Sequence, residues 1–482
     1  MSTPARPTAS ARPVPLVVDL DGTLIRTDLL HESVIQLVKA KPQMALALPA
    51  WLAAGKAALK RQVARRVPLD VRDLPYNQPL IDWIRAERAG GRSIVLCTAS
   101  DERYAFAVAE HLGLFDEVIA SDGVVNVSAG RKARLLVERF GEQGFDYAGN
   151  SRDDLIVWRH ARHAVVVNAS AAVCALARAQ GRVEREFARE ATGPRTWLRA
   201  MRVHQWLKNL LVLLPLAGSF QFGNLLLVRQ SLLAFLAFGL CASSVYILND
   251  LMDLESDRSH PRKRLRPFAA GLLSPLAGIG FAGLLLALSV GLAWCVQPAF
   301  LAWLGLYFAL TLAYSVFLKR RVLIDCITLG GLYTLRIVAG GAAVDLQPSF
   351  WLLAFSLFLF LSLAFLKRFS ELSLLARDGR DDARGRGYQA SDLALVQSLG
   401  TAAGFNAVML LALYINGDTV LRLYSQPEVV WLTIPILLYW ISRMWMQAQR
   451  GHMHDDPVVF ALRDRYSLAC GLLFAATLWA AR

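Results

Sequence analysis

The chain has 482 residues, of which 55% are hydrophobic and 19% charged, and its formal net charge is +14. Its mean hydropathy of +0.38 argues against a wholly soluble protein. The basic residues gather between apolar runs, for example in 262–266 and 319–321, as the positive-inside rule predicts, so the charge does not indicate nucleic-acid binding. The six cysteines lack the spacing of a metal site or a disulfide framework.

The first third of the chain reads as an α/β domain. Residues 1–13 are rich in proline and alanine and lack the apolar core of a signal peptide, so we expect a disordered tail on the cytoplasmic side. Short strands are expected within 14–22 and at 93–97, 117–120, 145–148 and 164–168, with helices between them. This alternation predicts a Rossmannoid parallel sheet over 14–180, with a helical cap at about 28–90. An apolar stretch at 44–52 in the cap is too short to span a membrane.

The first chemical motif follows the first expected strand and reads Asp19-Leu20-Asp21-Gly22-Thr23-Leu24. Carboxylates at i and i+2 at a strand end face the same way. One can attack phosphorus and help to hold a magnesium ion, and the other can protonate the leaving oxygen. Glycine permits the turn that exposes them. The motif therefore predicts a phosphoryl-transfer site.

This hexapeptide resembles the haloacid dehalogenase (HAD) superfamily of phosphohydrolases, and the resemblance covers about residues 14–180. It implies Asp19 as nucleophile, Asp21 as acid/base, Thr98 as a hydrogen-bonding partner of the phosphoryl group and Lys132 as the neutralising cation. Asn150 stands where the family usually has its first metal-binding aspartate, and an amide oxygen binds Mg²⁺ more weakly than a carboxylate does. The implied magnesium ligands are Asp19, Asp21, Asn150, Asp153 and Asp154.

The remaining two-thirds reads as an all-α polytopic membrane domain. Residues 181–205 are basic and are expected to form an amphipathic linker helix before a domain at 206–482. About nine transmembrane helices are expected, at 207–227, 231–248, 268–293, 298–317, 323–343, 350–367, 394–415, 429–446 and 459–480. Basic residues concentrate in alternate connections, so we expect an integral protein of the cytoplasmic membrane with the first domain and both active sites on the cytoplasmic side.

The second chemical motif lies at the end of the second expected span. Asp250, Asp253 and Asp257 are spaced by three and four residues, which places them on one face of a helix. Carboxylates at a membrane boundary are costly unless they bind a divalent cation, and oxygen ligands suit Mg²⁺ held together with a substrate diphosphate. The basic run 262–266 that follows can bind phosphate oxygens or only signal topology; both interpretations stay open.

Residues 249–257 (Asn-Asp-Leu-Met-Asp-Leu-Glu-Ser-Asp) resemble the first signature of the UbiA superfamily of intramembrane prenyltransferases. The superfamily's second aspartate-rich motif is reduced here to Asp325, with Leu329 where a partner carboxylate is expected. That departure points to the branch that moves phosphoribosyl from phosphoribosyl pyrophosphate to a polyprenyl phosphate. The segments that are similar to this branch are 201–209, 249–267, the loop 314–319 and the late segment 461–465. The resemblance implies magnesium on Asp250, Asp253 and Asp257, and substrate contacts from Lys208, Asn209, Asn249, Arg262, Lys263, Arg266, Tyr314, Lys319, Asp325 and Arg336.

The two motifs together predict a membrane phosphoribosyltransferase whose fused phosphatase removes the 5-phosphate of the lipid product. Its partners are then a polyprenyl phosphate, phosphoribosyl pyrophosphate and the bilayer, without nucleic acid. The alternative is an aromatic polyprenyl-diphosphate prenyltransferase with a regulatory or inactive first domain, which predicts a second carboxylate pair near Asp325. The sequence does not indicate an oligomeric state.

Overall fold

The computed structural model describes residues 13–190, 192–377, 387–417, 424–453 and 456–482. The expected tail therefore lies almost wholly outside the described residues. Two compact units are defined by contacts: one comprises the chain to Met201 together with Tyr246–Phe281, and the other comprises Arg202–Val245 and Ala282–Arg482. The acidic motif thus belongs to the same unit as the N-terminal sheet.

The first unit contains a six-stranded sheet of parallel strands in the order β3-β2-β1-β4-β5-β6. β1 is at its centre, with Val17 opposite Val95 of β2 and Tyr147 of β4. Five strands confirm the expected positions. Their bounds are β1 Leu16–Val18, β2 Ile94–Asp101, β3 Glu117–Ser121, β4 Asp146–Gly149 and β5 Ala164–Val167.

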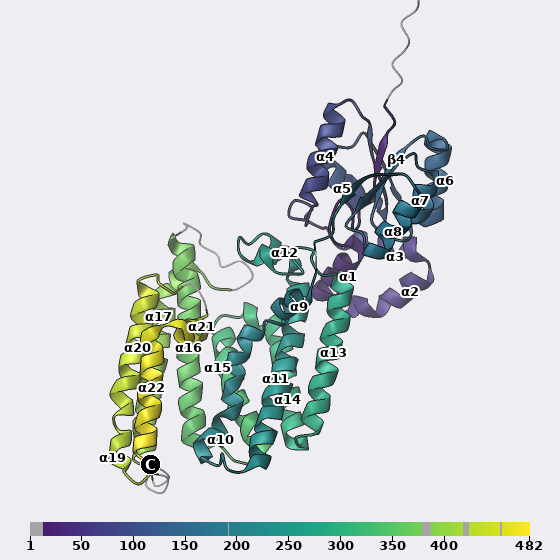
Figure 1. The fold of residues 1–482 in the computed structure, drawn as a ribbon. Coiled ribbons are helices and arrows are strands. Elements are labelled where there is room, and N and C mark those ends of the chain that lie inside the picture. The colour runs from purple at the N-terminus through teal and green to yellow at the C-terminus, as the bar shows by residue number, and fades with distance from the viewer. Residues whose placement is uncertain (1–12, 191, 378–386, 418–423, 454–455) are drawn as a thin grey trace, which may run out of the picture. The chain divides into compact units, whose positions relative to one another are not determined.

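Helices cover both faces of this sheet, because its strands alternate apolar side chains between two cores. Leu16 and Val18 pack on one side with α4 (Gln78–Ala89) and α5 (Glu102–Leu112), whereas Val17 packs on the other with α6 (Ala129–Phe140), α7 (Asp154–His160) and α8 (Ala171–Ala179). Figure 1 shows these two sets of helices on opposite sides of the strands. Strands buried on both faces are typical of parallel sheets.

The expected cap comprises α1 (Leu29–Ala40), η1 (Pro42–Ala47), α2 (Leu48–Ala53) and α3 (Lys56–Ala64). The expected range extends to residue 90, but the last helix within it, α4, packs with the sheet through Leu80, Ile81 and Ile84. Its apolar positions recur at helical spacing and therefore bury one face against the strands. α1 and α3 also reach this core, through Leu29 and Ala64.

The prediction of a linker helix at 181–205 is wrong in its first part. Residues Val183–Phe187 form β6, which pairs in parallel with β5 at the edge of the sheet. Phe187 lies 5.7 Å from the Trp83 ring, and the Arg185 guanidinium lies over the same ring. The open backbone edge of β5 and this aromatic contact outweigh the helical periodicity of the basic residues. The second part is helical, as α9 (Pro194–Met201).

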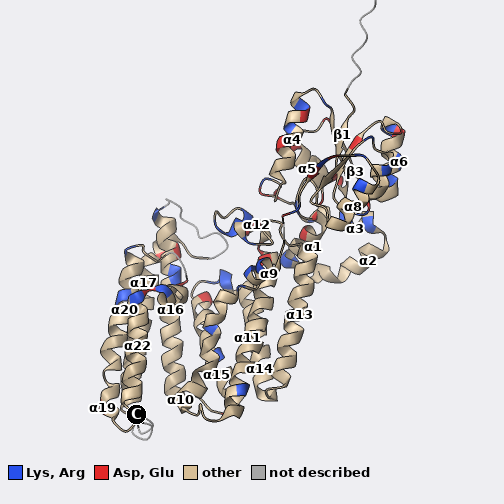
Figure 2. Cartoon of the chain, in the orientation of Figure 1, with Lys and Arg blue, Asp and Glu red and all other residues tan. Residues whose placement is uncertain are grey.

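Seven of the nine expected spans are long, apolar helices among the described residues. Figure 2 shows the body of α13 without charged residues. The segments at 207–227 and 459–480 are built from shorter pieces: η2 (Val203–Leu213) with α10 (Leu214–Ser219), and α21 (Pro457–Arg463) with α22 (Arg465–Ala480). The candidate spans are α11 Leu225–Met252, α13 Pro275–Trp294, α14 Pro298–Val316, α15 Ile324–Val344, α16 Phe350–Arg377, α17 with its preceding turn at Ala390–Ile415, and Pro427–Gln449, which holds α19 (Pro427–Val430) and α20 (Thr433–Gln449).

Small residues bring the spans of the second unit together. A side chain at Gly400 of α17 would meet Trp445 of α20 and Phe365 of α16 within 3 Å, and one at Gly404 would meet Ile441 and Ser362. Spacing of two glycines by four residues is a common way for membrane helices to approach closely. α16, α17 and α20 thereby form the core of this unit.

Candidate active sites

The first site lies at the carboxyl edge of the sheet. Asp19 follows β1 directly, and one of its carboxylate oxygens accepts a hydrogen bond from Lys132 Nζ at 2.7 Å. Lys132 is itself buried and also donates to the Tyr147 hydroxyl at 2.8 Å. Burial raises the pKa of Asp19 to about 6, although Lys132 opposes the shift. The pair agrees in geometry with a nucleophile held beside a neutralising cation.

Asp21 is fixed by two donors. The backbone N–H of Leu29 donates to Oδ1 at 2.9 Å, and the Ser100 hydroxyl donates to Oδ2 at 2.6 Å. Burial, followed by repulsion from Asp28, raises the pKa of Asp21 to about 7. A carboxyl group that holds its proton near neutral pH can act as a general acid.

The remaining predicted residues of this site come from β2 and the β4–α7 loop. Thr98 is fully buried, and its hydroxyl accepts from the Ser100 N–H at 3.0 Å. Gly22 has φ +76°, and a side chain there would lie 2.1 Å from the Asn150 amide nitrogen. The Asn150 side chain therefore lies directly against the turn that carries Asp19 and Asp21.

Asp154 holds this loop in place. It accepts from the Tyr147 hydroxyl at 2.9 Å and from the backbone N–H groups of Asn150 and Ser151 at 2.9 and 2.8 Å. Both of its oxygens are therefore engaged by the protein, whereas Asp153 is exposed at the start of α7. The donor set suits Mg²⁺, because a cation beside Asp19 and Asp21 would offset the cost of burying two carboxylates. Sequence reasoning missed Tyr147 and Ser100, which no motif marks.

A pocket beside Asp21 is lined partly by a segment far away in the sequence. Arg26, His31 and Asn168 line it together with Gly271, Leu272, Ser274 and Leu276. Gly271 has φ +70°, and a side chain there would lie 2.7 Å from Arg26 Cβ. The segment leads directly into α13, a candidate membrane span. This pocket therefore joins the phosphohydrolase-like site to the start of an apolar helix.

A buried ion pair fixes that segment within the first unit. Arg258, the last residue of α12 (Leu254–Arg258), donates to both carboxylate oxygens of Glu32 in α1, at 2.8 and 2.5 Å. Its Nε donates to the backbone oxygen of Ala269 at 3.0 Å. Glu32 is 3% exposed and Arg258 9%. Paired and hydrogen-bonded on both sides, the charges tolerate burial.

The acidic motif is not one continuous helix. α11 ends at Met252, and α12 begins after Asp253. The break allows Asp250 and Asp257 to converge on Arg266 Nη1, at 3.2 and 2.6 Å, while Asp253 lies 3.2 Å from Lys39 Nζ. The expectation that these residues lie on one continuous helix is therefore wrong at Asp253; Asp250 and Asp257 share Arg266, and Asp253 pairs with Lys39.

This cluster can hold a divalent metal ion. Asp250 and Asp257 are both 2% exposed. The side-chain oxygen of the adjacent Asn249 is buried and has no hydrogen-bond partner among the described residues. Two carboxylates and an orphaned amide oxygen are hard donors of the kind that Mg²⁺ binds. Arg266, the only member of the basic run that is not fully exposed, lies beside them, whereas Arg262 and Lys263 are exposed in the described chain.

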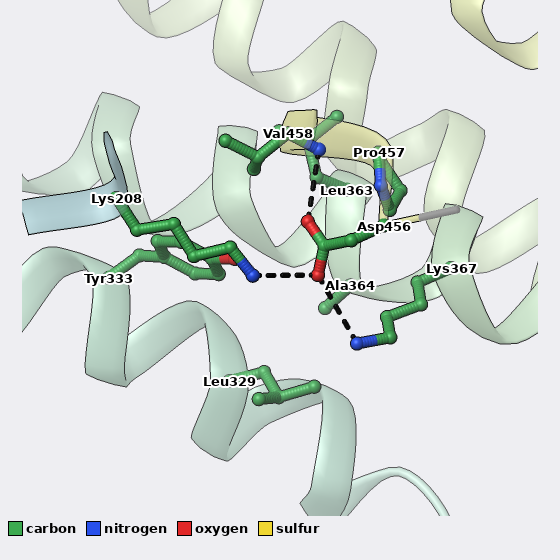
Figure 3. Close-up of a pocket in the computed structure, with 9 residues that line it drawn as sticks. All are labelled: Lys208, Leu329, Tyr333, Leu363, Ala364, Lys367, Asp456, Pro457 and Val458. Carbon is green, nitrogen blue, oxygen red and sulfur yellow. Dashed lines mark hydrogen bonds and ion pairs between the residues drawn. The ribbon is translucent and has the colours of Figure 1, made fainter. Parts of the chain in front are cut away.

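The second unit contains a separate cationic pocket, drawn in Figure 3. Lys208 Nζ and Lys367 Nζ both contact Asp456 Oδ2, at 2.7 and 3.2 Å. Burial alone would raise the pKa of Asp456, but the two ammonium groups hold it well below its usual range. Two cations against one carboxylate leave a positive charge, beside the ring of Tyr333. Lys208 was predicted, whereas Lys367 and Asp456 were missed; charged residues flanking an apolar run were the only signal.

Arg336 is a buried cation within α15. Its guanidinium donates to the Asn209 side-chain oxygen at 3.0 Å, the Leu332 backbone oxygen at 2.6 Å and the Tyr307 hydroxyl at 2.9 Å. All three acceptors are neutral, so the charge is solvated without being cancelled. Ionisable residues inside membrane domains usually mark functional paths. Two residues that were each predicted to contact substrate, Asn209 and Arg336, therefore lie in direct contact.

The Asp325 carboxylate contacts other side chains of the protein. It is fully buried at the start of α15, 2.6 Å from Arg368 Nη2, and it accepts from the Tyr388 hydroxyl at 2.6 Å. Arg368, also fully buried, pairs in addition with Glu371. Tyr314 and Lys319 are half-buried at the end of α14 and in η4 (Leu318–Arg320). Sequence reasoning missed Arg368 and Tyr388.

Replacing Arg368 by methionine (R368M) is expected to lower the free energy of unfolding by about 3–5 kcal/mol, because Asp325 would stay buried without its cation. The measurement is thermal unfolding of the purified protein in detergent. The double variant D325N/R368M should recover part of the loss, since it removes both charges. An R368M protein as stable as the parent would contradict a structural role for this pair.

The fold and the two sites define an integral membrane protein that carries an HAD-like domain. Residues 16–157 match the haloacid dehalogenase-like hydrolase family, and residues 212–478, more than half of the chain, match the UbiA prenyltransferase family. The chain belongs to the UbiA prenyltransferase family. Membership of this family together with the hydrolase match implies an enzyme.

Several known proteins are similar to this chain. The uncharacterized protein y4nM of Sinorhizobium fredii is 38% identical over 96% of this chain and 90% of its own length. Decaprenyl-phosphate phosphoribosyltransferase of Mycolicibacterium smegmatis is 32% identical over 59% of this chain and 91% of its own. A solved UbiA homolog from Archaeoglobus fulgidus, bound to DMAPP and Mg²⁺, is 18% identical and covers 59% of this chain and 98% of its own, with a TM-score of 0.45.

Proposed function

We propose that residues 206–482 transfer a 5-phosphoribosyl group from phosphoribosyl pyrophosphate to a polyprenyl phosphate. The HAD-like domain, residues 14–180, then removes the 5-phosphate of the lipid product, and residues 181–205 connect the two. Both reactions use Mg²⁺ and take place on the cytoplasmic face of the membrane. Similarity to decaprenyl-phosphate phosphoribosyltransferases over about nine-tenths of the M. smegmatis protein supports this choice of reaction.

The observation that carries the proposal is the environment of Asp325. An aromatic prenyltransferase of the usual kind needs a second carboxylate site for magnesium in this region. Here the carboxylate is buried against Arg368 and Tyr388, and Leu329 occupies the position of the expected partner carboxylate. A carboxylate whose charge is already cancelled by a guanidinium is a poor metal ligand, which favours a donor that needs one acidic motif.

The transferase step is a displacement at the anomeric carbon of the ribose. A phosphate oxygen of the polyprenyl phosphate attacks the anomeric carbon of the ribose, the bond from that carbon to pyrophosphate breaks, and pyrophosphate leaves. Magnesium, when bound, stabilises the charge that develops on pyrophosphate. Asp250, Asp257 and the orphaned Asn249 oxygen would hold it. Arg266, beside Asp250 and Asp257, supplies a cation for the pyrophosphate oxygens. In the second unit, Lys208 and Arg336 are cations that can bind phosphate groups.

The phosphatase chemistry uses the carboxyl edge of the sheet. Asp19 attacks the 5-phosphate phosphorus, and Asp21 gives its proton to the departing ribose oxygen. Lys132 stabilises the charge on the aspartyl-phosphate, and Asp21 then takes a proton from the water that hydrolyses it. The pocket beside Asp21 ends at Leu272 and Leu276, next to the start of α13. These two leucines, in a lining that is otherwise mostly polar, support a substrate with a lipid portion.

Replacing Lys208 by methionine (K208M) is expected to raise the KM of one of the two phosphate substrates on the order of 10-fold, because a charge-assisted contact is lost. Initial rates with each substrate varied in turn would identify which one. Arg450→Met, at an exposed position after α20, serves as the control. Unchanged KM values for both substrates would remove Lys208 from the binding site.

The proposal is tested by turnover of the purified protein with magnesium, a polyprenyl monophosphate and phosphoribosyl pyrophosphate, with the lipid product followed by mass. Turnover of a polyprenyl diphosphate with an aromatic acceptor in its place would overturn it.

A further inference from the structure

Residues 42–54 of the cap form a segment that is apolar both on the side that packs against the cap and on the opposite side. Residues 42–54 read Pro-Gln-Met-Ala-Leu-Ala-Leu-Pro-Ala-Trp-Leu-Ala-Ala and contain a single polar side chain and no charge. They form η1 and α2, and neither element contains a buried residue. Figure 2 shows α2 free of charged residues. Neither the transferase nor the phosphatase chemistry uses this segment.

The inner side of the segment is accounted for by packing. Met44, Leu48 and Trp51 lie against a small core formed by α1 and α3, whose buried members are Leu37, Val63 and Val67. These contacts are sufficient to hold the segment on the cap. A helix that met water on its other side would carry polar residues there.

The outer side carries large apolar groups instead. Leu46 is 86% exposed and Leu52 is 52% exposed, with exposed alanines and a proline between them. A contiguous apolar patch of this kind marks an interaction surface. Thirteen residues of helix extend only about 20 Å, which is less than the roughly 30 Å of the hydrocarbon core. The segment can therefore lie in a membrane interface but cannot cross it.

The charges at the ends of the segment identify its partner. Lys41 and Lys56 flank it directly and are both exposed, and the exposed Arg66 lies 4.8 Å from the Trp51 ring. Exposed apolar residues bordered by cations are the composition that binds anionic lipid surfaces. The same chain contains seven candidate membrane spans among its described residues, so its first domain is tethered to a bilayer.

We propose that residues 42–54 insert into the interface of an anionic membrane and anchor the cap of the HAD-like domain to it. α1 follows Asp21 closely in the chain, and its first N–H holds the Asp21 carboxylate. An anchor one helix away from Asp21 keeps the mouth of that site at the lipid surface. This binding surface does not depend on the proposed function.

The test uses the full-length protein in nanodiscs that contain anionic lipid. Leu46→Cys (L46C) is labelled with an environment-sensitive fluorophore, and Val124→Cys (V124C), at a position 88% exposed in the same unit, is the matched control. Cys174 and Cys295 are replaced by alanine in both proteins, because the other four cysteines are buried. Quenching is measured with spin-labelled lipid and with aqueous iodide.

The label at position 46 should be quenched by the spin-labelled lipid and should be several-fold less accessible to iodide than the label at position 124. Equal iodide quenching at the two positions would overturn the proposal, because the segment would then face water. Protection from iodide without quenching by lipid would also overturn it and would indicate a second copy of the chain or another protein as the occupant.

Discussion

Replacing Asp250 by alanine (D250A) is expected to lower the rate of phosphoribosyl transfer on the order of 100-fold or more, because the variant removes a carboxylate that would hold the magnesium ion on the departing pyrophosphate. Asp257→Ala should have a similar effect, since Asp250 and Asp257 converge on the same cation, Arg266. Asp253→Ala should cost less, because Asp253 pairs with Lys39 of α1. The measurement is the initial rate of lipid product formation at saturating substrates.

The control for this series is Glu255→Gln, an exposed carboxylate in the same short helix. A surface change of this kind should leave the rate within about twofold of the parent. Equal losses in D253A and D250A would show that all three aspartates share one site, against the convergence seen in the structure. Full activity in D250A would remove the acidic motif from the transferase chemistry.

Asp19→Asn (D19N) is expected to lower removal of the 5-phosphate on the order of 1,000-fold or more while leaving the transfer step intact. An amide cannot act as the nucleophile, yet it keeps the size of the side chain and can still meet Lys132. The lipid product should therefore accumulate with its 5-phosphate, which the mass of the product reports directly.

Asp82→Asn, an exposed carboxylate on α4 of the same domain, is the matched control and should behave as the parent does. If the parent protein itself leaves the 5-phosphate in place, the first domain has another substrate or a regulatory role. Asn150 makes this outcome informative, because an amide oxygen at that position weakens magnesium binding. An Asn150→Asp variant that then gained the activity would identify the amide as the cause.

The sequence predicts the parts of the fold that are set by local patterns. Short apolar runs located β1 to β5. Four of these strands are buried on both faces, whereas β3, at the edge of the sheet, is mostly half-buried. β6 was missed because only its end residues, Val183 and Phe187, are partly buried. Its place is set by the free edge of β5, which is a tertiary feature that periodicity does not report.

The sequence predicts a candidate site where the spacing of residues within a motif fixes the positions of their side chains. The spacing of Asp19 and Asp21 brings both carboxylates to one strand end, as the structure has them. The partners that come from distant helices were not predictable, because nothing local in α16 indicates that Arg368 faces Asp325 or that Lys367 faces Asp456. The break between α11 and α12 was also hidden, since residues 249–257 contain neither proline nor glycine.

The central claim is that the transferase domain makes a phosphoribosylated lipid. The most direct measurement incubates the purified protein in detergent with magnesium, a polyprenyl monophosphate and phosphoribosyl pyrophosphate, and follows the lipid by mass alongside the D250A variant. We predict a phosphoribosylated lipid from the parent protein, without its 5-phosphate, and none from D250A. No product from these substrates, with turnover of a polyprenyl diphosphate and an aromatic acceptor by the same preparation, would contradict the account.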